Sequence, residues 1–328
     1  VESVEVIDDY TIKLNLSSWD SILIDDIARG SGMISKEAFE ANGEDWANFN
    51  PVGTGPWVLT KFERQQQLVY EPFEDYWGEG MPCLNGLVIE QVPDPMTAIA
   101  MIKAGDVAAL YQTDPMTANE LQSEEGYQID IFPGLHNVVV MNTIDENSVL
   151  YDVRMREALE YAIDKQSIAD ATGFGFSKPY YEIIHSIHEA GGNPGTTPRA
   201  YDPDKARDLI ADAGYADGVD TTLTFSSRQP PDAYVAMQQY LADVGINVEL
   251  NPVDDVALNQ MSFEPPEGND LRIEGQRGGL LNPLGSTKET LTSNSVYFPG
   301  LARPEGFDDL VQKALDSEDP AEQMMYLE

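Results

Sequence analysis

Hydrophobic and polar residues alternate at the start of the chain, with the spacing of half-buried β-strands. Val4 and Val6 alternate with polar residues, and Ile12 and Leu14 do the same after an intervening acidic pair. Two such runs joined by turn-forming residues predict a β-hairpin over residues 2–16.

Apolar residues three or four positions apart predict helices. The clearest case is residues 152–163, where Asp152 is placed to cap the helix and Arg156 to pair with Glu160. Further helices are predicted at residues 20–28, 35–42, 94–105, 202–214 and 232–244. Strands are predicted at residues 56–62, 67–71, 86–92, 136–142, 220–225 and 246–250, and in the run "DLRIE". The alternation of strands with helices indicates an α/β protein.

Two stretches rich in Gly, Pro, Asn, Ser and Thr, residues 173–200 and 276–304, are predicted to be long loops. Long loops in compact domains are often functional. We therefore looked for candidate site residues in and beside them.

The chain is strongly acidic: it contains 57 Asp and Glu residues but only 19 Lys and Arg, for a formal net charge of −38 over 328 residues. This balance argues against nucleic acid as a partner, since phosphate binding needs clustered cations. The acidic residues are spread along the chain, which suggests a halophilic protein whose self-repulsion is screened by concentrated salt. A merely acidic protein from an ordinary environment is the alternative.

The cysteine count and the lengths of the apolar runs exclude several structural features. The lone Cys83 allows no internal disulfide. No run of apolar residues is long enough for a transmembrane helix, and the start does not have the pattern of a signal peptide. Both ends lie inside predicted elements, so we expect the chain to be a fragment.

The run "PVGTGPWVL" raises the question of a nucleotide site, because Gly53 and Gly55 are spaced as in phosphate-binding loops. A dinucleotide fingerprint needs a third glycine, where Val58 stands, and a helix after it, where a strand is predicted. We interpret the run as a turn in which the two glycines supply positive φ angles.

Two histidines, His185 and His188, are weak candidates for a metal site because imidazoles three residues apart share a metal on a helix. No third ligand is evident, and two surface histidines on a loop are the simpler interpretation. We predict no metal and no cofactor. The Gly-x-Ser-x-Gly pattern of many hydrolases is also missing, so the sequence supports no enzyme.

Arg272, Gln276, Arg277 and Asn282 are the predicted ligand-binding residues. Arg272 lies in the predicted strand "DLRIE", and the other three lie in the glycine-rich run "GQRGGLLNP" that follows it. An arginine at a strand end beside a cleft holds a carboxylate in a bidentate manner. Surface arginines among acids remain an equal alternative.

Several segments together resemble the family 5 extracellular solute-binding proteins, the peptide and nickel receptors of ABC importers. The resemblance is carried, in the family's order, by "PVGTGPWVLTKF", "FEDYWGEGMPCLNGLVIEQVPDPMTAIAMIKAGDV", "VVVMNTIDENSVLYDVRMREALEYAIDKQSI", "YDPDKARDLIADAGY", "YLADVGINVEL" and "GFDDLVQKALDSEDPAEQ". It covers nearly the whole chain.

The resemblance implies a two-lobed periplasmic-binding-protein type II-like fold with mixed sheets, which closes over its ligand and is incomplete in this fragment. Residues 1–51 would belong to the small subdomain of the first lobe, residues 52–143 to its sheet domain, and residues 144–328 to a truncated second lobe. A membrane-anchored, extracellular protein at the cell surface is implied, with ABC permease subunits as partners. We expect a monomer.

The sequence departs from the family pattern in the loop after "DLRIE". Peptide-binding members resemble one another in a Trp and an Asp that pairs with the ligand's amino group, and those positions hold Gln276 and Gly279 here. The amino-group anchor is lost unless another acid has moved in, and Arg277 offers positive charge instead. The resemblance implies capture of a peptide or similar small polar solute; anionic, sugar-like or metal-chelate ligands, and a sensor with the same fold, remain alternatives.

Overall fold

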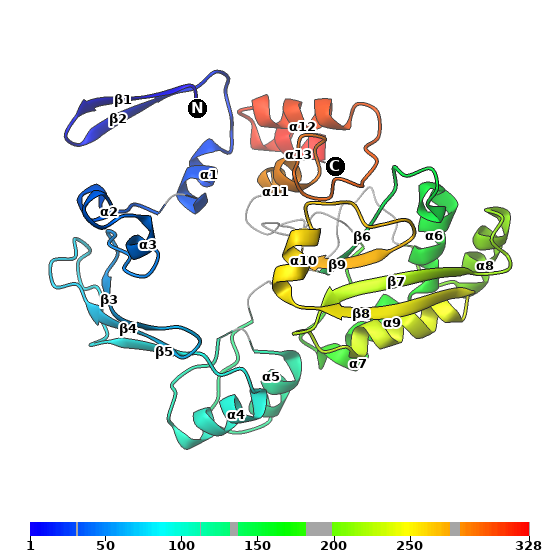
Figure 1. Ribbon diagram of the computed structural model, residues 1–328, viewed down its shortest axis with the longest axis horizontal. Coiled ribbons are helices and arrows are strands. Elements are labelled where there is room, and N and C mark those ends of the chain that lie inside the picture. Colours follow the sequence, from blue (N-terminus) through cyan, green and yellow to red (C-terminus); the bar gives the residue numbers. More distant parts are fainter. Residues whose placement is uncertain (31, 112, 132–136, 182–198, 276–282, 328) are drawn as a thin grey trace. The chain divides into compact units, whose positions relative to one another are not determined.

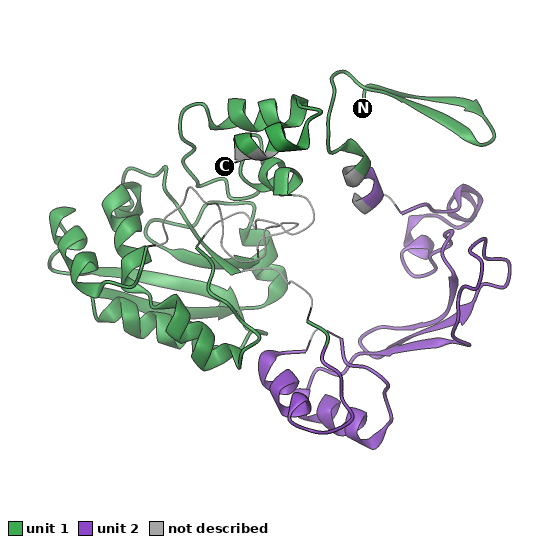
Figure 2. Cartoon of the chain, turned by 180° about the vertical axis from the view of Figure 1, so that it is seen from behind, with its two compact units in different colours: residues 1–24, 130–328 green, residues 25–129 purple. Residues whose placement is uncertain are grey.

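The computed structural model describes residues 1–30, 32–111, 113–131, 137–181, 199–275 and 283–327. The chain divides into two compact units, shown in different colours in Figure 2. The first unit joins residues 1–24 to residues 130–328, and the second comprises residues 25–129. None of the described helices is long and apolar enough to cross a membrane.

The second unit contains one antiparallel sheet and several short helices (Figure 1). Its strands, in the sheet order β3-β4-β5, are β3 (Trp57–Glu63), β4 (Gln67–Pro72) and β5 (Leu87–Glu90). Its helices are α2 (Lys36–Asn42), α3 (Glu44–Ala47), α4 (Pro95–Ala104) and α5 (Pro115–Gln122), and α1 (Leu23–Gly30) crosses the boundary between the units. The three predicted strands are confirmed.

Helix α4 begins and ends where the sequence predicts. The Asp94 carboxylate accepts a hydrogen bond from the Thr97 amide at 2.8 Å, Pro95 opens the first turn, and Gly105 ends the helix with φ 78°. Helix α5 has the same Asp-Pro start, yet it is not among the predicted helices, because its few apolar residues give no clear helical period.

The Gly-Thr-Gly turn leads into β3, as predicted, but neither glycine has the positive φ that we expected. Gly53 instead forms an isolated bridge with Ile34. A Cβ atom at this position would lie 3.1 Å from the Met33 carbonyl oxygen. The turn therefore needs glycine for a close approach of two backbone segments.

The first unit is built on a mixed four-stranded sheet with the order β6-β9-β7-β8. The strands are β6 (Asn137–Met141), β7 (Val219–Ser226), β8 (Ile246–Val253) and β9 (Leu271–Gly275). Strand β7 is parallel to β8 and β9, and β6 is antiparallel to β9. The mixed pairing confirms the predicted α/β class with mixed sheets.

Helices cover one face of this sheet (Figure 1). They are the 3₁₀ turn η1 (Val149–Tyr151), α6 (Val153–Ala162), α7 (Lys165–Gly173), α8 (Pro203–Asp212) and α9 (Asp232–Ala242). Met155 and Ala158 of α6 pack with Leu241 of α9 and with Leu223 and Leu271 of the sheet. The buried positions on α6 confirm its predicted apolar stripe.

The remaining elements of this unit are a hairpin and helices near the end of the chain. They are β1 (Ser3–Asp8), β2 (Thr11–Asn15), α10 (Asp255–Met261), α11 (Pro283–Thr290), α12 (Phe307–Asp316) and α13 (Pro320–Leu327). The β1–β2 hairpin confirms the prediction for residues 2–16. A small core joins Ile22 to Leu284 of α11 and to Val311 and Leu315 of α12.

Helix α11 contradicts the predicted loop over residues 276–304. Its composition is unfavourable for a helix, but Thr287 and Thr290 donate their hydroxyls to the carbonyls of Pro283 and Ser286 at 2.8 and 2.7 Å. Both threonines are 1% exposed. Burial therefore decides this helix, which local propensity does not favour.

The segment 291–303 is held by Arg303. It packs on Val138 and Val140 of β6, whereas Val139 and Met141 of the same strand face the helix-covered core, so it lies on the opposite face of the sheet. The Arg303 side chain donates from Nε to the Leu291 carbonyl at 2.9 Å, from Nη1 to Leu301 at 2.6 Å and from Nη2 to Phe298 at 3.3 Å. Burial lowers the pKa of Arg303. Phe298 is 3% exposed and has φ 52°, a strained angle for a bulky residue, so the segment's path is strongly constrained.

The same segment is fastened to the end of β6. The Thr143 amide donates to the Gly300 carbonyl at 2.7 Å, and the Thr143 hydroxyl accepts from the Ala302 amide at 2.7 Å. A Cβ atom on Gly300 would lie 2.8 Å from Pro265 Cβ. Only glycine allows this approach, which sets the position of the neighbouring Phe298.

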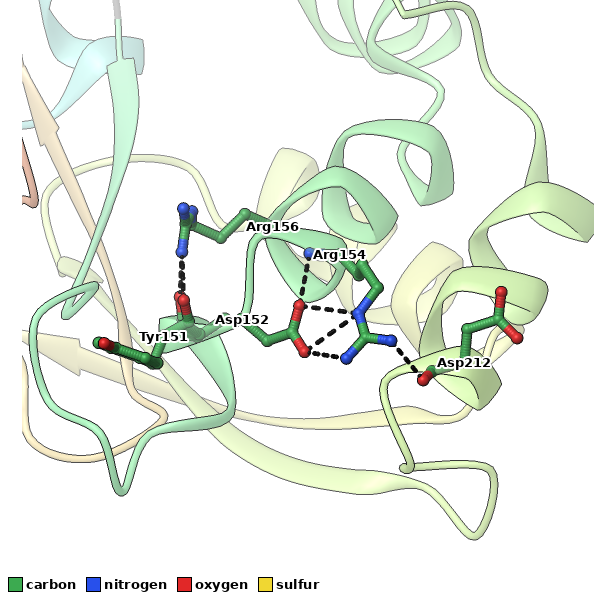
Figure 3. A network of polar contacts seen from close by, with 6 residues as sticks. Tyr151, Asp152, Arg154, Arg156 and Asp212 are labelled. Carbon is green, nitrogen blue, oxygen red and sulfur yellow. Dashed lines mark hydrogen bonds and ion pairs between the residues drawn. The ribbon is translucent and has the colours of Figure 1, made fainter. Parts of the chain in front are cut away.

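A network at the start of α6 ties that helix to α8 (Figure 3). Asp152 accepts from the Arg154 amide at 2.9 Å and from Arg154 Nε at 3.0 Å, and Arg154 Nη1 donates to the Asp212 carbonyl at 2.6 Å. Arg156 donates to the Tyr151 carbonyl at 2.8 Å, so its predicted pairing with Glu160 is wrong.

This network generates a prediction about acid stability. The hydrogen bonds from Arg154 lower the pKa of Asp152, so its stabilising contribution is complete above the ordinary aspartate pKa and is lost as pH falls through the lowered value. Asp152→Asn keeps a capping side chain but removes the charge. We expect it to lower the free energy of unfolding at neutral pH by about 1 kcal/mol or less. The difference from the unsubstituted protein should shrink below about pH 4 in urea titrations; a constant difference would contradict the assignment.

The Arg303 contacts generate a second prediction. Arg303→Met leaves three carbonyls without their donor and should cost about 2 kcal/mol in the free energy of unfolding. Amide exchange at Leu301 and Ala302 should accelerate before global unfolding. Arg303→Lys has one donor nitrogen in place of three, so its free energy of unfolding should lie between those of the unsubstituted protein and Arg303→Met. Arg199→Met is the matched control, because Arg199 makes an exposed pair with Glu157. Equal losses at residues 199 and 303 would refute the role of Arg303.

Candidate functional site

A pocket of about 170 Å³ lies in the first unit, at the edge of the mixed sheet. Its walls come from α10, the last residues of β9, the end of α11 and the segment 291–303. The lining residues are Asp255, Leu258, Asn259, Ser262, Glu274, Gly275, Thr290, Tyr297 and Phe298. Because β7, β8 and β9 run parallel, their carboxyl ends share this edge, which is where open α/β sheets bind ligands.

A buried ion pair on β9 lies beside the pocket, and Glu274 is the member of the pair that lines it. Arg272 and Glu274 are 4% and 7% exposed, and Arg272 Nε donates to Glu274 Oε1. Arg272 Nη2 also donates to the Glu264 carbonyl at 3.0 Å. The two residues share one face of the strand, while Ile273 between them packs into the helix-covered core. Burial this deep requires the charges to be paired.

Helix α10 forms the second wall and is fixed at its start. The Asp254 carboxylate accepts from the amides of Val256 and Ala257 at 3.0 and 2.9 Å. Asp255, which follows the cap, accepts from the Ser226 hydroxyl at the end of β7 and from Arg228 Nη1 at 3.1 Å. These contacts attach α10 to the sheet edge and use both oxygens of the Asp255 carboxylate.

Aromatic rings form the third wall. Phe298 packs against Val140 of β6 and Leu291, and the Tyr297 ring lies 5.5 Å from the Phe263 ring, centroid to centroid. The contacts of Arg303, Thr143 and Gly300 described above hold this wall in place. The pocket therefore combines a rigid aromatic side with a buried charged side.

The predicted site residues are placed as follows. Arg272 faces its partner Glu274 beside the pocket, and its predicted contact with a solute stays a prediction. Gln276, Arg277 and Asn282 lie outside the described residues, as do the metal candidates His185 and His188. Among the residues that the structure describes, no group of three His, Cys, Asp or Glu side chains could hold a metal ion.

Sequence reasoning missed Glu274 and the aromatic wall. Glu274 lies in the same "DLRIE" run as Arg272, two positions along, so strand alternation alone would have placed both side chains on one face. Tyr297 and Phe298 had no such signal, because the contact between their segment and β6 joins residues more than 150 positions apart.

A more open hollow of about 340 Å³ lies in the second unit, beside β3. Its Arg64 guanidinium lies 4.9 Å from the centre of the Phe49 ring, and Phe49 contacts Phe62 at 5.5 Å between ring centroids. Lys61 on its rim pairs with Glu63 at 3.0 Å. This surface has no buried polar group directed into it, so we favour the pocket at the end of β9.

Comparisons with known proteins agree with this arrangement. The solved structure of the periplasmic binding protein DppA from Helicobacter pylori, in complex with peptide STSA, matches with a TM-score of 0.83 at 23% identity. It covers 99% of this chain and 65% of that one. NikA from Brucella suis, in complex with Fe(III)-EDTA, matches with a TM-score of 0.81 at 21% identity, covering 99% of this chain and 69% of that one. The fold is therefore that of these binding proteins.

Sequence comparison identifies the family. The glutathione-binding protein GsiB of Salmonella paratyphi A is 30% identical over 259 residues, which cover 77% of this chain and 49% of that protein. The chain thus spans about half of that relative's length. Residues 1–269 match the model for bacterial extracellular solute-binding proteins, family 5 Middle. Since that match covers most of the chain, the protein belongs to the family 5 bacterial extracellular solute-binding proteins.

Proposed function

We propose that the protein is the substrate-binding component of an ABC importer and captures a peptide or a similar small polar solute. The observation that carries the proposal is the pocket at the carboxyl ends of β7, β8 and β9 in a member of this family. Relatives of this fold are described with a bound peptide, with Fe(III)-EDTA and as glutathione-binding, and all three ligands are small and polar.

In the proposed mechanism the protein binds the solute and does not catalyse a reaction. The solute would contact the pocket and be enclosed by closure of two lobes, formed by residues 1–51 with 52–143 and by residues 144–328. Arg272, Gln276, Arg277 and Asn282 are the proposed binding residues; Gln276 directly follows the pocket residue Gly275 in the chain. The proposed location is the cell surface, with a membrane anchor, and the proposed partners are the permease subunits.

We also propose that the protein is adapted to concentrated salt. The formal net charge is −38, and every ion pair described in the structure except Arg272–Glu274 has at least one exposed side chain, so these pairs offset little of the mutual repulsion between carboxylates. At ~1 M salt the Debye length is about 3 Å, which screens that repulsion.

The salt proposal predicts that the free energy of unfolding rises from dilute buffer to molar potassium or sodium chloride. Urea titrations at both salt concentrations measure it. Sucrose at matched osmolality is the control, because it favours the compact state without screening charge. Equal stability in dilute and molar salt, or an equal gain in sucrose, would contradict the proposal.

The binding proposal predicts that at least one small polar solute raises Tm in a saturable way in molar salt. A ligand at 100 times its Kd adds about 2.7 kcal/mol to the free energy of unfolding. The panel should contain di- and tripeptides, glutathione, sugars, organic acids and Fe(III)-EDTA. For an anionic solute, Arg277→Ala should weaken binding about tenfold or more, and Arg199→Ala is the control. A panel without any saturable shift would count against a solute receptor.

A further inference from the structure

Arg64, which directly follows β3 in the second unit, is an arginine without an acceptor. No side-chain hydrogen bond or ion pair joins it to any residue that the structure describes. Every other arginine whose side chain the structure describes donates to a carboxylate or to a backbone carbonyl. The adjacent Glu63 is already engaged, because its Oε2 pairs with Lys61 at 3.0 Å and accepts from Gln67 at 2.7 Å. In a chain with 57 acidic side chains, an arginine without a carboxylate is unusual.

An aromatic ring positions the Arg64 guanidinium. The central carbon of the guanidinium lies 4.9 Å from the centroid of the Phe49 ring, within the range of a cation–π interaction. The ring supplies no oxygen or nitrogen acceptor, so this contact uses none of the N–H donors in a conventional hydrogen bond. The planar N–H fork of Arg64 is therefore available to an acceptor from outside the chain.

The hollow beside Arg64 has an apolar wall that a β-bulge creates. Strand β3 pairs Leu59 with Tyr70 and Phe62 with Leu68, and the register shifts between Leu59 and Lys61. Tyr70 and Leu68 are two positions apart on β4 and so share one face of the sheet. The bulge therefore places Leu59 and Phe62 on that same face, although regular alternation would separate them. Both residues line the hollow.

The size and charge of the hollow define the ligand that it fits. Its volume of about 340 Å³ lies within the usual range for small-molecule sites, about 300–1,000 Å³. Lys61 on the rim is matched by Glu63, so Arg64 is the cation of this hollow that lacks a counter-charge. One guanidinium fork matches one carboxylate in a bidentate manner. The apolar wall beside it favours a monocarboxylate with a hydrocarbon body over a bare anion or a dianion.

We propose that this hollow binds a small organic monocarboxylate, with the carboxylate on the Arg64 fork and the hydrocarbon body against Leu59 and Phe62. Phe49 orients the guanidinium. The site uses residues of the second unit alone and shares none with the pocket at the end of β9. It is a second binding site and does not depend on the proposed function.

The test uses a matched pair of probes that differ in charge. Binding of para-fluorophenylacetate is measured by fluorine NMR at neutral pH, in the lowest salt in which the chain stays folded. We expect saturable binding in about the millimolar range. The neutral para-fluorophenylacetamide should bind at least about fivefold more weakly, because it offers no charge to Arg64. Acetate and inorganic phosphate, which have no hydrocarbon body for the wall, should displace the probe only at concentrations about tenfold higher than phenylacetate.

Variants assign the binding to this hollow. Arg64→Gln should weaken the carboxylate probe about fivefold and remove its advantage over the amide. Arg64 is exposed and has no partner among the described residues, so its replacement leaves no buried group unsatisfied. Phe62→Ser should weaken both probes by the same factor, because the apolar wall serves both. Arg199→Gln is the matched control, since Arg199 is a half-exposed arginine of the first unit.

Each outcome decides the proposal. A charge preference that Arg64→Gln removes and Arg199→Gln leaves intact supports the site. Equal affinity for the amide, unchanged binding by Arg64→Gln, or displacement by phosphate as effective as by phenylacetate overturns the assignment of ligand class. Absence of saturable binding below about 10 mM overturns the site itself. None of these results bears on the pocket at the end of β9, because the two sites share no residue.

Discussion

The pairing of Arg272 with Glu274 is the interaction on which the candidate site depends. Both side chains are placed on one face of β9 by strand alternation, while Leu271 and Ile273 anchor the opposite face in the helix-covered core. Neither charge has enough water around it to stand alone, and removing one partner of a buried pair typically costs about 3–5 kcal/mol. The pair thus fixes both side chains beside the pocket.

The pocket is assembled from elements that are distant in the sequence. Helix α10 is attached to the end of β7 through Asp255 and Ser226, and the aromatic segment is attached to β6 through Thr143 and Gly300. Arg303 satisfies three carbonyls of that segment, which accounts for a buried Phe298 in a strained backbone conformation. Rigid supports of this kind hold binding groups in position at little entropic cost when a ligand arrives.

The chain's acidity affects the surface and the pocket differently. At ~1 M salt the Debye length is about 3 Å, so the charges of exposed carboxylates are screened over that distance. A nearly buried carboxylate is screened much less. The buried pair of Arg272 and Glu274 would therefore keep its attraction under conditions that screen the surface charges. In strong salt, exposed ion pairs contribute little to stability, so buried contacts contribute relatively more.

The sequence by itself determined the α/β class, the β1–β2 hairpin and the helices whose ends have strong signals, such as Asp94 with Gly105 around α4. Caps, turns and apolar periods are local, so they act before distant segments meet. Tertiary contacts decided the rest: α11 forms in a predicted loop because its threonines are buried, and Gly53 serves a close approach rather than a positive φ. The wall at Phe298 belongs to the same class, since burial and long-range packing, which no local pattern records, created it.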